Sequence, residues 1–253
     1  MTLLVDVGNT RVKWARLDAA GDLGPQSAAA HAGWSADDWR SALFGGAPVG
    51  RVLASSVAGE TTNAALAAAA RAAGGSPVEF VATAREAAGV RNGYADPRLL
   101  GVDRWVAVIG AWNRVHACCV VADVGTAATI DVVAADGRHR GGYIVPGPAL
   151  MVRSLLRSTS DLAPRHAAGG AAAHAAGFAD NTRDAIERGC RLALAALIER
   201  CFGDAALSAA AGPPCLLVTG GAATEVLPYL RIEAEHVPDL VLRGLRELAR
   251  GPV

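Results

Sequence analysis

Short apolar runs that end in small polar residues alternate with helical patterns along this chain. Residues 3–5 (LLV) form the first apolar run, and residues 6–10 (DVGNT) break it before a second strand-like run over 13–17. A strand that ends in Asp and turns through Gly and Asn predicts a tight hairpin. The hairpin explains the glycine and the amide but leaves Asp6 and Lys13 without a role, so both are candidates for chemistry.

The same pattern returns near the middle of the chain. Residues 120–125 read VVADVG, against LLVDVG at 3–8, and Asp123 is the carboxylate of the second copy. A polar turn with Thr126 follows, and then another strand-like run over 130–133. The shared residues are few, but their place at the start of each half favours internal duplication over a chance match.

The rest of each half predicts further strands and helices. Apolar runs predict strands over 49–55, 78–81 and 215–218, and periodic apolar positions predict helices over 62–73, 102–115, 149–156 and 241–249. Another helix is predicted from Asn181 or Thr182, either of which can cap it, with an apolar stripe of Ile186, Cys190, Leu194, Leu197 and Cys201. Residues 167–177 contain only Ala, Gly and His, which predicts a mobile connecting loop.

Strand pairs followed by helices, repeated twice, predict an α/β protein of two related halves. We place these halves at 1–116 and 117–253. Each half carries one Asp-x-Gly turn, and we expect both turns to point into a central cleft between the two lobes.

Composition narrows the class of protein. Apolar residues make up 52% of the 253 residues and charged residues 19%, which fits a folded globular protein with a substantial core. The formal net charge is zero, so no overall field attracts the chain to nucleic acid or to a membrane. The N-terminus lacks a signal-peptide pattern, and no uncharged apolar stretch approaches the ~20 residues of a membrane span, so we expect a cytoplasmic protein.

Cysteine and histidine spacing argues against disulfides and zinc. The five cysteines show no C-x-x-C spacing, and an odd number suits thiols in a reducing compartment. Cys118, Cys119, Cys190 and Cys201 lie in apolar patterns and are expected to pack in the core. The six histidines form no short metal-type pair, so we expect no zinc site.

The glycine turns are suited to phosphate. Turns that expose backbone N–H groups beside Asn, Thr and Lys can bind phosphate oxygens. Neither a P-loop nor a G-x-G-x-x-G fingerprint occurs. What remains is a pair of phosphate-facing turns, each with a carboxylate that could hold a cation. A third glycine turn at 219–222 follows a predicted strand, where a nucleoside could lie against bare backbone.

The ordered set of motifs resembles type III pantothenate kinases. The matching stretches are DVGNTRVK at 6–13, GVDR at 101–104, DVGTA at 123–127, GGYIVPGP at 141–148 and TGGAA at 219–223, in the expected order over nearly the whole chain. The resemblance implies a duplicated ribonuclease-H-like, actin-like fold. It also implies ATP-dependent phosphorylation of pantothenate, the first step of coenzyme A biosynthesis, by a homodimer with its active sites at the subunit interface.

On the nucleotide side, the resemblance places ATP against both glycine turns. The residues assigned to ATP are Asp6, Val7, Gly8, Asn9, Thr10, Arg11, Val12, Lys13 and Thr126. Asp6 would orient Mg²⁺ on the nucleotide, because Mg²⁺ binds through few carboxylates together with phosphates and water. Asp123 would bind a monovalent cation, K⁺ or NH₄⁺.

On the substrate side, the resemblance assigns pantothenate to Tyr94, Gly101, Val102, Asp103, Arg104 and Thr182. Asp103 would accept the proton of the substrate hydroxyl, because phosphoryl transfer needs an oriented nucleophile. Arg104 would neutralise charge on the substrate carboxylate or on the transferring phosphoryl group. Thr182 would reach the active site of the other subunit.

Each of these assignments competes with a purely structural role. Asp6 could be an ordinary turn residue, and Tyr94 a half-buried loop aromatic. Asp103 in the first turn of a helix would be favoured by ~0.3–1 kcal/mol through the helix dipole alone. Thr182 could be a helix cap, a role that is compatible with a substrate contact. The ordered motifs favour the functional roles.

Two other functions account for fewer residues. A kinase of the same fold acting on a sugar or another small acid leaves the GVDR segment at 101–104 unexplained. A non-catalytic, nucleotide-binding regulator would be free to lose Asp6, Lys13, Asp103 and Arg104, yet all four are present. We therefore expect a pantothenate kinase with no nucleic-acid or membrane partner.

Overall fold

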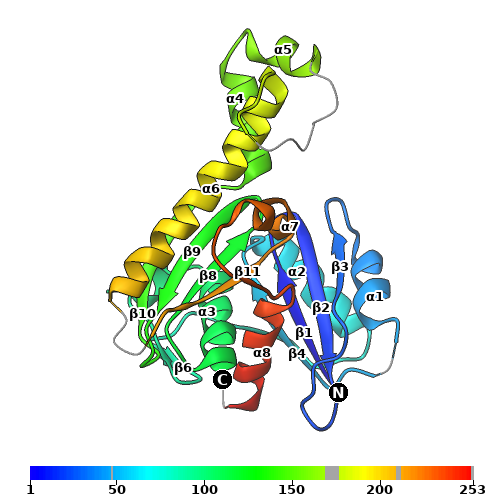
Figure 1. Ribbon diagram of the computed structural model, residues 1–253. Helices are drawn as coiled ribbons and strands as arrows, with labels where there is room; N and C mark the ends of the chain where they lie inside the picture. The colour runs from blue at the N-terminus through cyan, green and yellow to red at the C-terminus, as the bar shows by residue number, and fades with distance from the viewer. Residues whose placement is uncertain (47, 169–176, 209–211, 252–253) are drawn as a thin grey trace. The chain divides into compact units, whose positions relative to one another are not determined.

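Each half of the chain builds a five-stranded sheet around the hairpin predicted at its start. The computed structural model describes residues 1–46, 48–168, 177–208 and 212–251. The strand order is β3-β2-β1-β4-β5 in the first sheet and β10-β9-β8-β11-β12 in the second. The matching order confirms the predicted α/β class and its internal duplication (Figure 1).

Contacts between segments divide the chain into two units. Unit 1 contains Met1–Ala117, Val133–Gly141 and Asp239–Val253, and unit 2 contains Cys118–Val132 and Gly142–Pro238. This grouping differs from the predicted halves 1–116 and 117–253 in two segments that belong to unit 1: Val133–Gly141 and the C-terminal segment with the helix α8 (Leu240–Arg250). The helix α8 belongs to unit 1 because its apolar side packs on α3 (Val102–Val115) and on β1.

One face of the sheet of unit 1 packs on α1 (Ala36–Phe44) and α2 (Glu60–Ala72), and the opposite face carries buried apolar residues together with Asp6. Its strands are β1 (Thr2–Val7), β2 (Arg11–Leu17), β3 (Ser27–Ala30), β4 (Arg51–Ser56) and β5 (Val78–Phe80). Leu3 and Val5 pack in a buried cluster with Trp39 of α1 and Leu66 of α2. Successive residues of a strand alternate between faces, so Asp6 lies on the opposite face, the one without this cluster.

Short elements lead from this sheet to α3. The two-residue strands β6 (Glu86–Ala87) and β7 (Val90–Arg91) form a small hairpin, and the 3-10 turn η1 (Pro97–Leu99) follows. The helix α3 has the bounds that its apolar periodicity predicts, and residues 104–111 are buried.

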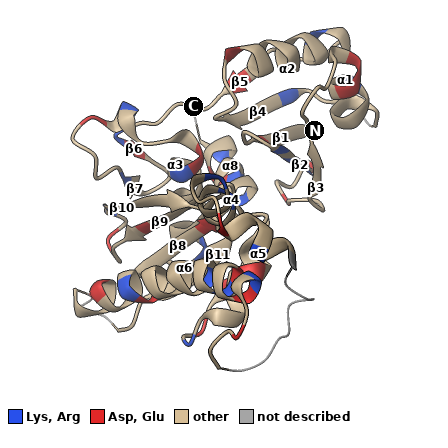
Figure 2. Ribbon diagram, turned by 90° about the horizontal axis from the view of Figure 1, so that it is seen from above, with Lys and Arg blue, Asp and Glu red and all other residues tan. Residues whose placement is uncertain are grey.

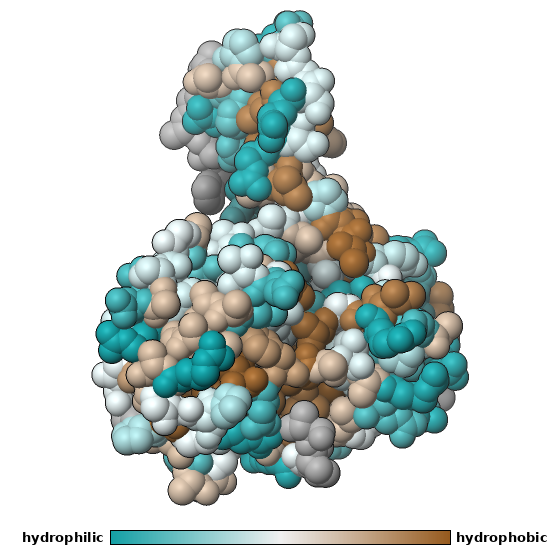
Figure 3. Space-filling model, turned by 180° about the vertical axis from the view of Figure 1, so that it is seen from behind, coloured by the Kyte–Doolittle hydropathy of each residue, from teal (hydrophilic) through white to brown (hydrophobic). Residues whose placement is uncertain are grey.

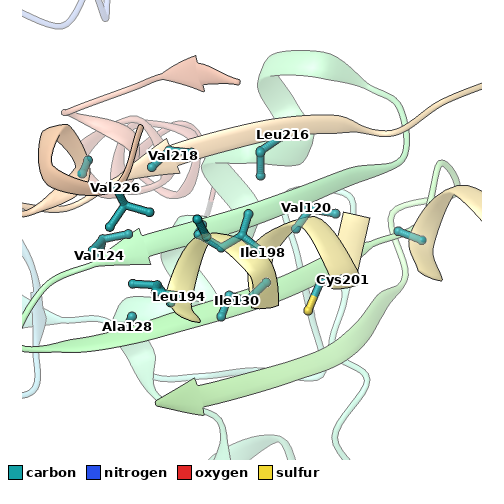
Figure 4. Close-up of a cluster of buried hydrophobic side chains, with 14 residues drawn as sticks. Val120, Val124, Ala128, Ile130, Leu194, Ile198, Cys201, Leu216, Val218 and Val226 are labelled. Atoms are coloured by element: carbon teal, nitrogen blue, oxygen red, sulfur yellow. The ribbon is translucent and has the colours of Figure 1, made fainter. Parts of the chain in front are cut away.

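The sheet of unit 2 is covered on one face by a long helix. Its strands are β8 (Cys119–Val124), β9 (Ala127–Val133), β10 (His139–Pro146), β11 (Cys215–Thr219) and β12 (Glu235–His236), and α6 spans Thr182–Leu207. Leu194, Ile198 and Cys201 of α6 pack against Val120 and Ile130 of the sheet (Figure 4). Leu194 and Cys201 of the predicted stripe lie in this cluster and Leu197 packs against it, while Ile186 and Cys190 are buried outside it. Burial raises the pKa of the Cys201 thiol.

A helical arm extends from the sheet of unit 2. It consists of α4 (Pro148–Ser158), α5 (Leu162–Ala168) and the first half of α6, which contact one another (Figure 1). The loop predicted at 167–177 is wrong for Ala167 and Ala168, which end α5, and residues 169–176 lie outside the described residues. The helix α5 was missed because its seven residues are too few for a clear period.

The other predicted elements are confirmed. Their ends differ by no more than two residues, except that β9 begins three residues before the run predicted at 130–133. The short helix α7 (Ala223–Val226) and the 3-10 turn η2 (Leu227–Tyr229) follow the third glycine turn. Charges of both signs are interspersed along α6 and over both units (Figure 2). Within the described ranges, no helix combines the length and the apolar run needed to cross a bilayer.

Arg51 links β4 to its neighbours in unit 1. Its guanidinium donates to the two carboxylate oxygens of Glu79 in β5, at 2.7–3.1 Å. It also donates to the carbonyl of Ala249 in α8, at 3.0 Å. Arg51 therefore links β4, the strand that carries Ser55, to both β5 and α8.

We expect Glu79→Gln to lower the free energy of unfolding by less than about 1 kcal/mol, because the pair is partly exposed. The hydrogen bond from Arg51 lowers the pKa of Glu79 below its ordinary value of 4.5. A carboxyl group with a depressed folded-state pKa stabilises the fold above its unfolded-state pKa, and this contribution is lost as pH falls through the folded-state pKa. In urea unfolding, the difference from wild type should be full at neutral pH and vanish well below pH 4.5. A difference that persists in acid would contradict this account.

Candidate active site

The first glycine turn joins β1 to β2 in unit 1. The Gly8 N–H donates to the Arg11 carbonyl at 3.0 Å, which closes the turn. Asp6 and Lys13 are direct cross-strand partners, so both side chains project from the same face. The turn thus presents a carboxylate and an ammonium group beside exposed backbone.

The residues of this turn divide into buried and exposed positions. Val7 and Val12 are fully buried in the core of unit 1, so they can contact a nucleotide only through their backbone. Asn9, Thr10 and Arg11 are exposed. Among the residues assigned to ATP in this stretch, Asn9, Thr10 and Arg11 therefore have side chains that can reach phosphate, and Val7 and Val12 do not.

His31 holds the first glycine turn from the side. Its Nε2 lies 2.7 Å from the Gly8 carbonyl oxygen, and because a carbonyl only accepts, Nε2 donates. The His31 N–H also donates to the Thr10 carbonyl at 3.4 Å, and the ring packs on Trp39 with centroids 5.4 Å apart. The sequence does not predict this contact, because nothing near His31 in the chain indicates that it lies beside the turn.

Asn92 organises the loop that carries Tyr94 in unit 1. Its buried side chain donates to the Ala84 carbonyl and accepts from the Tyr94 N–H at 2.9 Å. Any side chain at Gly93 would collide with the carbonyl of His139, so the loop lies directly against that strand. The Tyr94 ring stacks on the His139 ring with centroids 6.0 Å apart, a contact that sequence analysis did not foresee.

The start of α3 carries Gly101, Val102, Asp103 and Arg104, which the sequence assigns to the substrate side. Gly101 is the N-cap residue and offers no side-chain cap, and the Arg104 N–H donates instead to Asp103 Oδ1 at 2.8 Å. This bond fixes the direction of the Asp103 carboxylate. Arg104 is only 5% exposed, and its Nη1 donates to the Tyr94 hydroxyl at 3.0 Å. The structure thus brings Tyr94, Asp103 and Arg104 together in unit 1, next to Gly101 and Val102.

The second glycine turn joins β8 to β9 in unit 2. The Gly125 N–H donates to the Ala127 carbonyl at 3.0 Å, so the glycine N–H closes this turn as Gly8 closes the first one, with one residue fewer in the loop. The Gly147 N–H donates to the Thr126 carbonyl at 2.8 Å, so the GGYIVPGP segment supports this turn. Thr126 is exposed, as a phosphate contact requires.

The third glycine turn lies beside Asp123. Gly220 has φ +96°, a left-handed conformation that favours glycine, and a Cβ there would lie 2.5 Å from Asp123 Oδ1. The Ala222 N–H donates to the Val124 carbonyl at 2.8 Å. The Asp123 carboxylate therefore lies against the backbone of the third turn.

Thr182 lies at the start of α6, in the helical arm of unit 2. Asn181 is the N-cap, because its side chain accepts from the Asp184 N–H at 3.0 Å, so the alternative that Thr182 caps this helix is wrong. Thr182 is the first helical residue and is partly exposed. The cap does not use its hydroxyl.

The carboxylates suit a cation that binds together with phosphate. Among the residues that the structure describes, no three His, Cys, Asp or Glu side chains form a metal-type cluster. Mg²⁺ in phosphoryl-transfer sites is bound by one or two carboxylates, with phosphates and water as the other ligands. Asp6 beside a glycine turn fits this set of ligands, in which one carboxylate of the protein binds Mg²⁺ together with phosphates and water.

Comparisons of the sequence identify a family. A family model described as Type III pantothenate kinase matches residues 2–204. A type III pantothenate kinase of Aromatoleum aromaticum is 42% identical over 250 residues, which cover 99% of this chain and 98% of the relative. A type III pantothenate kinase of Azoarcus sp. (strain BH72) is 43% identical over 251 residues, with 98% and 90% covered.

Comparisons of the structure concern the fold alone. A Campylobacter jejuni protein described as a conserved Baf family transcriptional activator aligns with a TM-score of 0.62 at 21% identity, covering 98% of this chain and 97% of that chain. A Sinorhizobium meliloti protein described as a 2-dehydro-3-deoxygalactonokinase aligns with a TM-score of 0.61 at 16% identity, covering 99% and 98%. Both likenesses agree with a duplicated α/β fold.

Proposed function

The chain belongs to the type III pantothenate kinase family, and we propose that Asp103 is the general base of the family's reaction in this protein. The reaction is the ATP-dependent phosphorylation of pantothenate, the first step of coenzyme A biosynthesis. The observation that carries the proposal is the start of α3, where Asp103 and Arg104 are held in fixed directions by hydrogen bonds. An oriented carboxylate beside an oriented guanidinium suits a substrate with a hydroxyl at one end and a carboxylate at the other.

Phosphoryl transfer depends mainly on positioning and charge neutralisation. Asp103 would accept the hydroxyl proton of pantothenate as its oxygen attacks the terminal phosphorus of ATP. Arg104, fixed by the Tyr94 hydroxyl, would bind the substrate carboxylate or the transferring group, since Arg forms strong charge-assisted hydrogen bonds with both. Tyr94 has its ring stacked on His139 and would form one wall of the substrate site.

The nucleotide is assigned to the two glycine turns. We propose that ATP contacts the stretch from Asp6 to Lys13 and Thr126, with exposed N–H groups and the Lys13 ammonium facing phosphate oxygens. Asp6 would hold Mg²⁺, which supplies neutralisation of phosphate charge when bound. Lys13 projects from the same face as Asp6 and would act on the same phosphates.

Asp123 is proposed to hold a monovalent cation, K⁺ or NH₄⁺, next to the third glycine turn. Asp123→Ala should weaken ATP binding by about tenfold and flatten the response to potassium, because the carboxylate supplies part of the charge of that site. Calorimetric titration of ATP in potassium and in sodium buffers measures both effects. A wild-type protein indifferent to the monovalent cation would remove the potassium role and leave the kinase function standing.

We also propose a homodimer in the cytoplasm, in which the helical arm meets a second copy. The arm exposes Leu155 and Leu192, which are 41% and 47% exposed, and Phe178, shortly before α6, is 105% exposed. Figure 3 shows hydrophobic residues at the surface of this arm. Large exposed apolar side chains suit a protein interface, where they become buried. Thr182 on the same arm would then reach the partner's substrate.

A coupled ATP-turnover assay across a panel of small hydroxy acids and sugars tests the function. We expect turnover with pantothenate and little with the other compounds. Preference for a sugar or another acid would favour the alternative kinase. Nucleotide binding without any turnover would favour a non-catalytic regulator. The Asp103–Arg104 arrangement argues against that alternative, because a regulator does not need it.

A further inference from the structure

Two buried hydroxyl groups lie beside the carboxylates that end β1 and β8. Parallel pairing aligns Asp6 with Ser55 of β4, and Asp123 with Thr219 of β11. Ser55 and Thr219 are both 0% exposed. Neither hydroxyl oxygen has a hydrogen-bond partner within the described part of the chain.

The register places each hydroxyl on the same face as its carboxylate. Residues paired across neighbouring strands project to the same side of the sheet. Val5 and Ala54, one residue earlier in β1 and β4, belong to the core cluster, so Asp6 and Ser55 project to the opposite face. In unit 2, Ala122 and Val218 belong to the core cluster in the same way, which puts Asp123 and Thr219 on the face away from it.

Packing does not explain these hydroxyl groups. A buried polar group without a partner destabilises a fold, whereas an apolar residue of similar size would fill the position without that cost. Alanine at position 55 and valine at position 219 would serve packing equally well. The same arrangement occurs at equivalent strands of both units, which indicates one shared role rather than two accidents.

We propose that Ser55 and Thr219 position the hydrated cations that accompany ATP, each through a cation-bound water that its hydroxyl shares with the neighbouring carboxylate. Ser55 would act beside Asp6 on the Mg²⁺ of the nucleotide, and Thr219 beside Asp123 on the monovalent cation. A water between the two groups is required because hydroxyl and carboxylate do not bond directly here. The proposal rests on the cation roles proposed above for Asp6 and Asp123.

Support in unit 2 comes from the third glycine turn. The Asp123 carboxylate leans toward Gly220, which directly follows Thr219 in the chain. The carboxylate therefore approaches the end of the strand that carries the hydroxyl. Residues that orient metal ligands from behind typically alter cation affinity by about 10–100-fold when removed.

The test for Ser55 uses its neighbour as a matched control. Ser56 faces the other way, and its hydroxyl donates to Asn63 Oδ1 at 2.5 Å and accepts from the Ala58 N–H at 3.4 Å. In calorimetric ATP titrations at varied magnesium, Ser55→Ala should raise the Mg²⁺ concentration needed for half-maximal binding by about tenfold, and Ser56→Ala should not. Without ligand, Ser56→Ala should lower the melting temperature, whereas Ser55→Ala should not.

The test for Thr219 compares Thr219→Val with Thr219→Ser. The valine variant should lose the response of ATP binding to potassium, and the serine variant should retain it. The proposal would be overturned if the variants matched wild type in the dependence of ATP binding on both magnesium and potassium. It would also be overturned if Ser55→Ala lowered the melting temperature without ligand while its magnesium dependence stayed unchanged. A wild type indifferent to potassium would overturn the Thr219 half. Pantothenate turnover by wild type is measured first, so failure of the proposed function is recognised before any variant is compared.

Discussion

Asp103→Asn is expected to lower kcat for pantothenate phosphorylation by ~10²–10⁴-fold while ATP binding stays intact, because an amide cannot accept the hydroxyl proton. We expect the substitution to leave the fold unchanged. Asp103 Oδ1 accepts the Arg104 N–H at 2.8 Å, and the amide oxygen of asparagine can accept the same bond. A coupled assay gives kcat, and calorimetry gives the affinity for ATP.

The competing explanation for Asp103 is a favourable charge at a helix N-terminus. Asp37 lies in the first turn of α1, is exposed and has no place in the site, so Asp37→Asn is the matched control. If the helix dipole were the whole role of Asp103, both variants would lose a little stability and keep full activity. Near wild-type turnover by Asp103→Asn would show that the base lies elsewhere.

Elements with a long or repeated pattern could be predicted from the sequence. The helix α3 has the predicted bounds because its apolar positions recur at helical spacing over 14 residues. The two Asp-x-Gly turns were found by their likeness to each other. In the structure the glycine N–H closes both turns, by a bond to the residue three positions later in the first turn and two positions later in the second. The helix α1 was missed although Ser35 and Asp38 form a capping box at its start, a signal that is visible in the sequence.

Other features depend on tertiary pairing that no local pattern records. His139 meets Tyr94 because the 133–141 segment folds into unit 1, and the sequence separation of the two rings hides this contact. Ser55 and Thr219 meet their carboxylates only through the register of parallel strands, which are distant in the chain. The helix α8 belongs to unit 1 because it packs on α3, so dividing the chain at its midpoint assigns this helix to the other half.

The proposed contact of Thr182 with the partner's site has a direct consequence for activity. Thr182 lies on an arm that extends from the sheet of its own unit (Figure 1). A residue that acts in a partner's site can act only when the dimer forms, so activity should fall on dilution below the dissociation constant of the dimer. Thr182→Arg should therefore raise the KM for pantothenate strongly, whereas Thr182→Ser, which keeps the hydroxyl, should remain near wild type.

Mixing Asp103→Asn with Thr182→Arg subunits tests the shared site most directly. In the mixed dimer, one site combines the intact Asp103 of one chain with the intact Thr182 of the other, and the second site carries both defects. Random exchange of equal amounts makes half of the dimers mixed, so activity at low pantothenate should return to about a quarter of wild type, while each parent stays poor. Native mass measurement confirms that the subunits have exchanged. Activity that stays at the mean of the two parents after confirmed exchange would show that each site belongs to a single chain, and Thr182 would then have to act on the substrate of its own subunit.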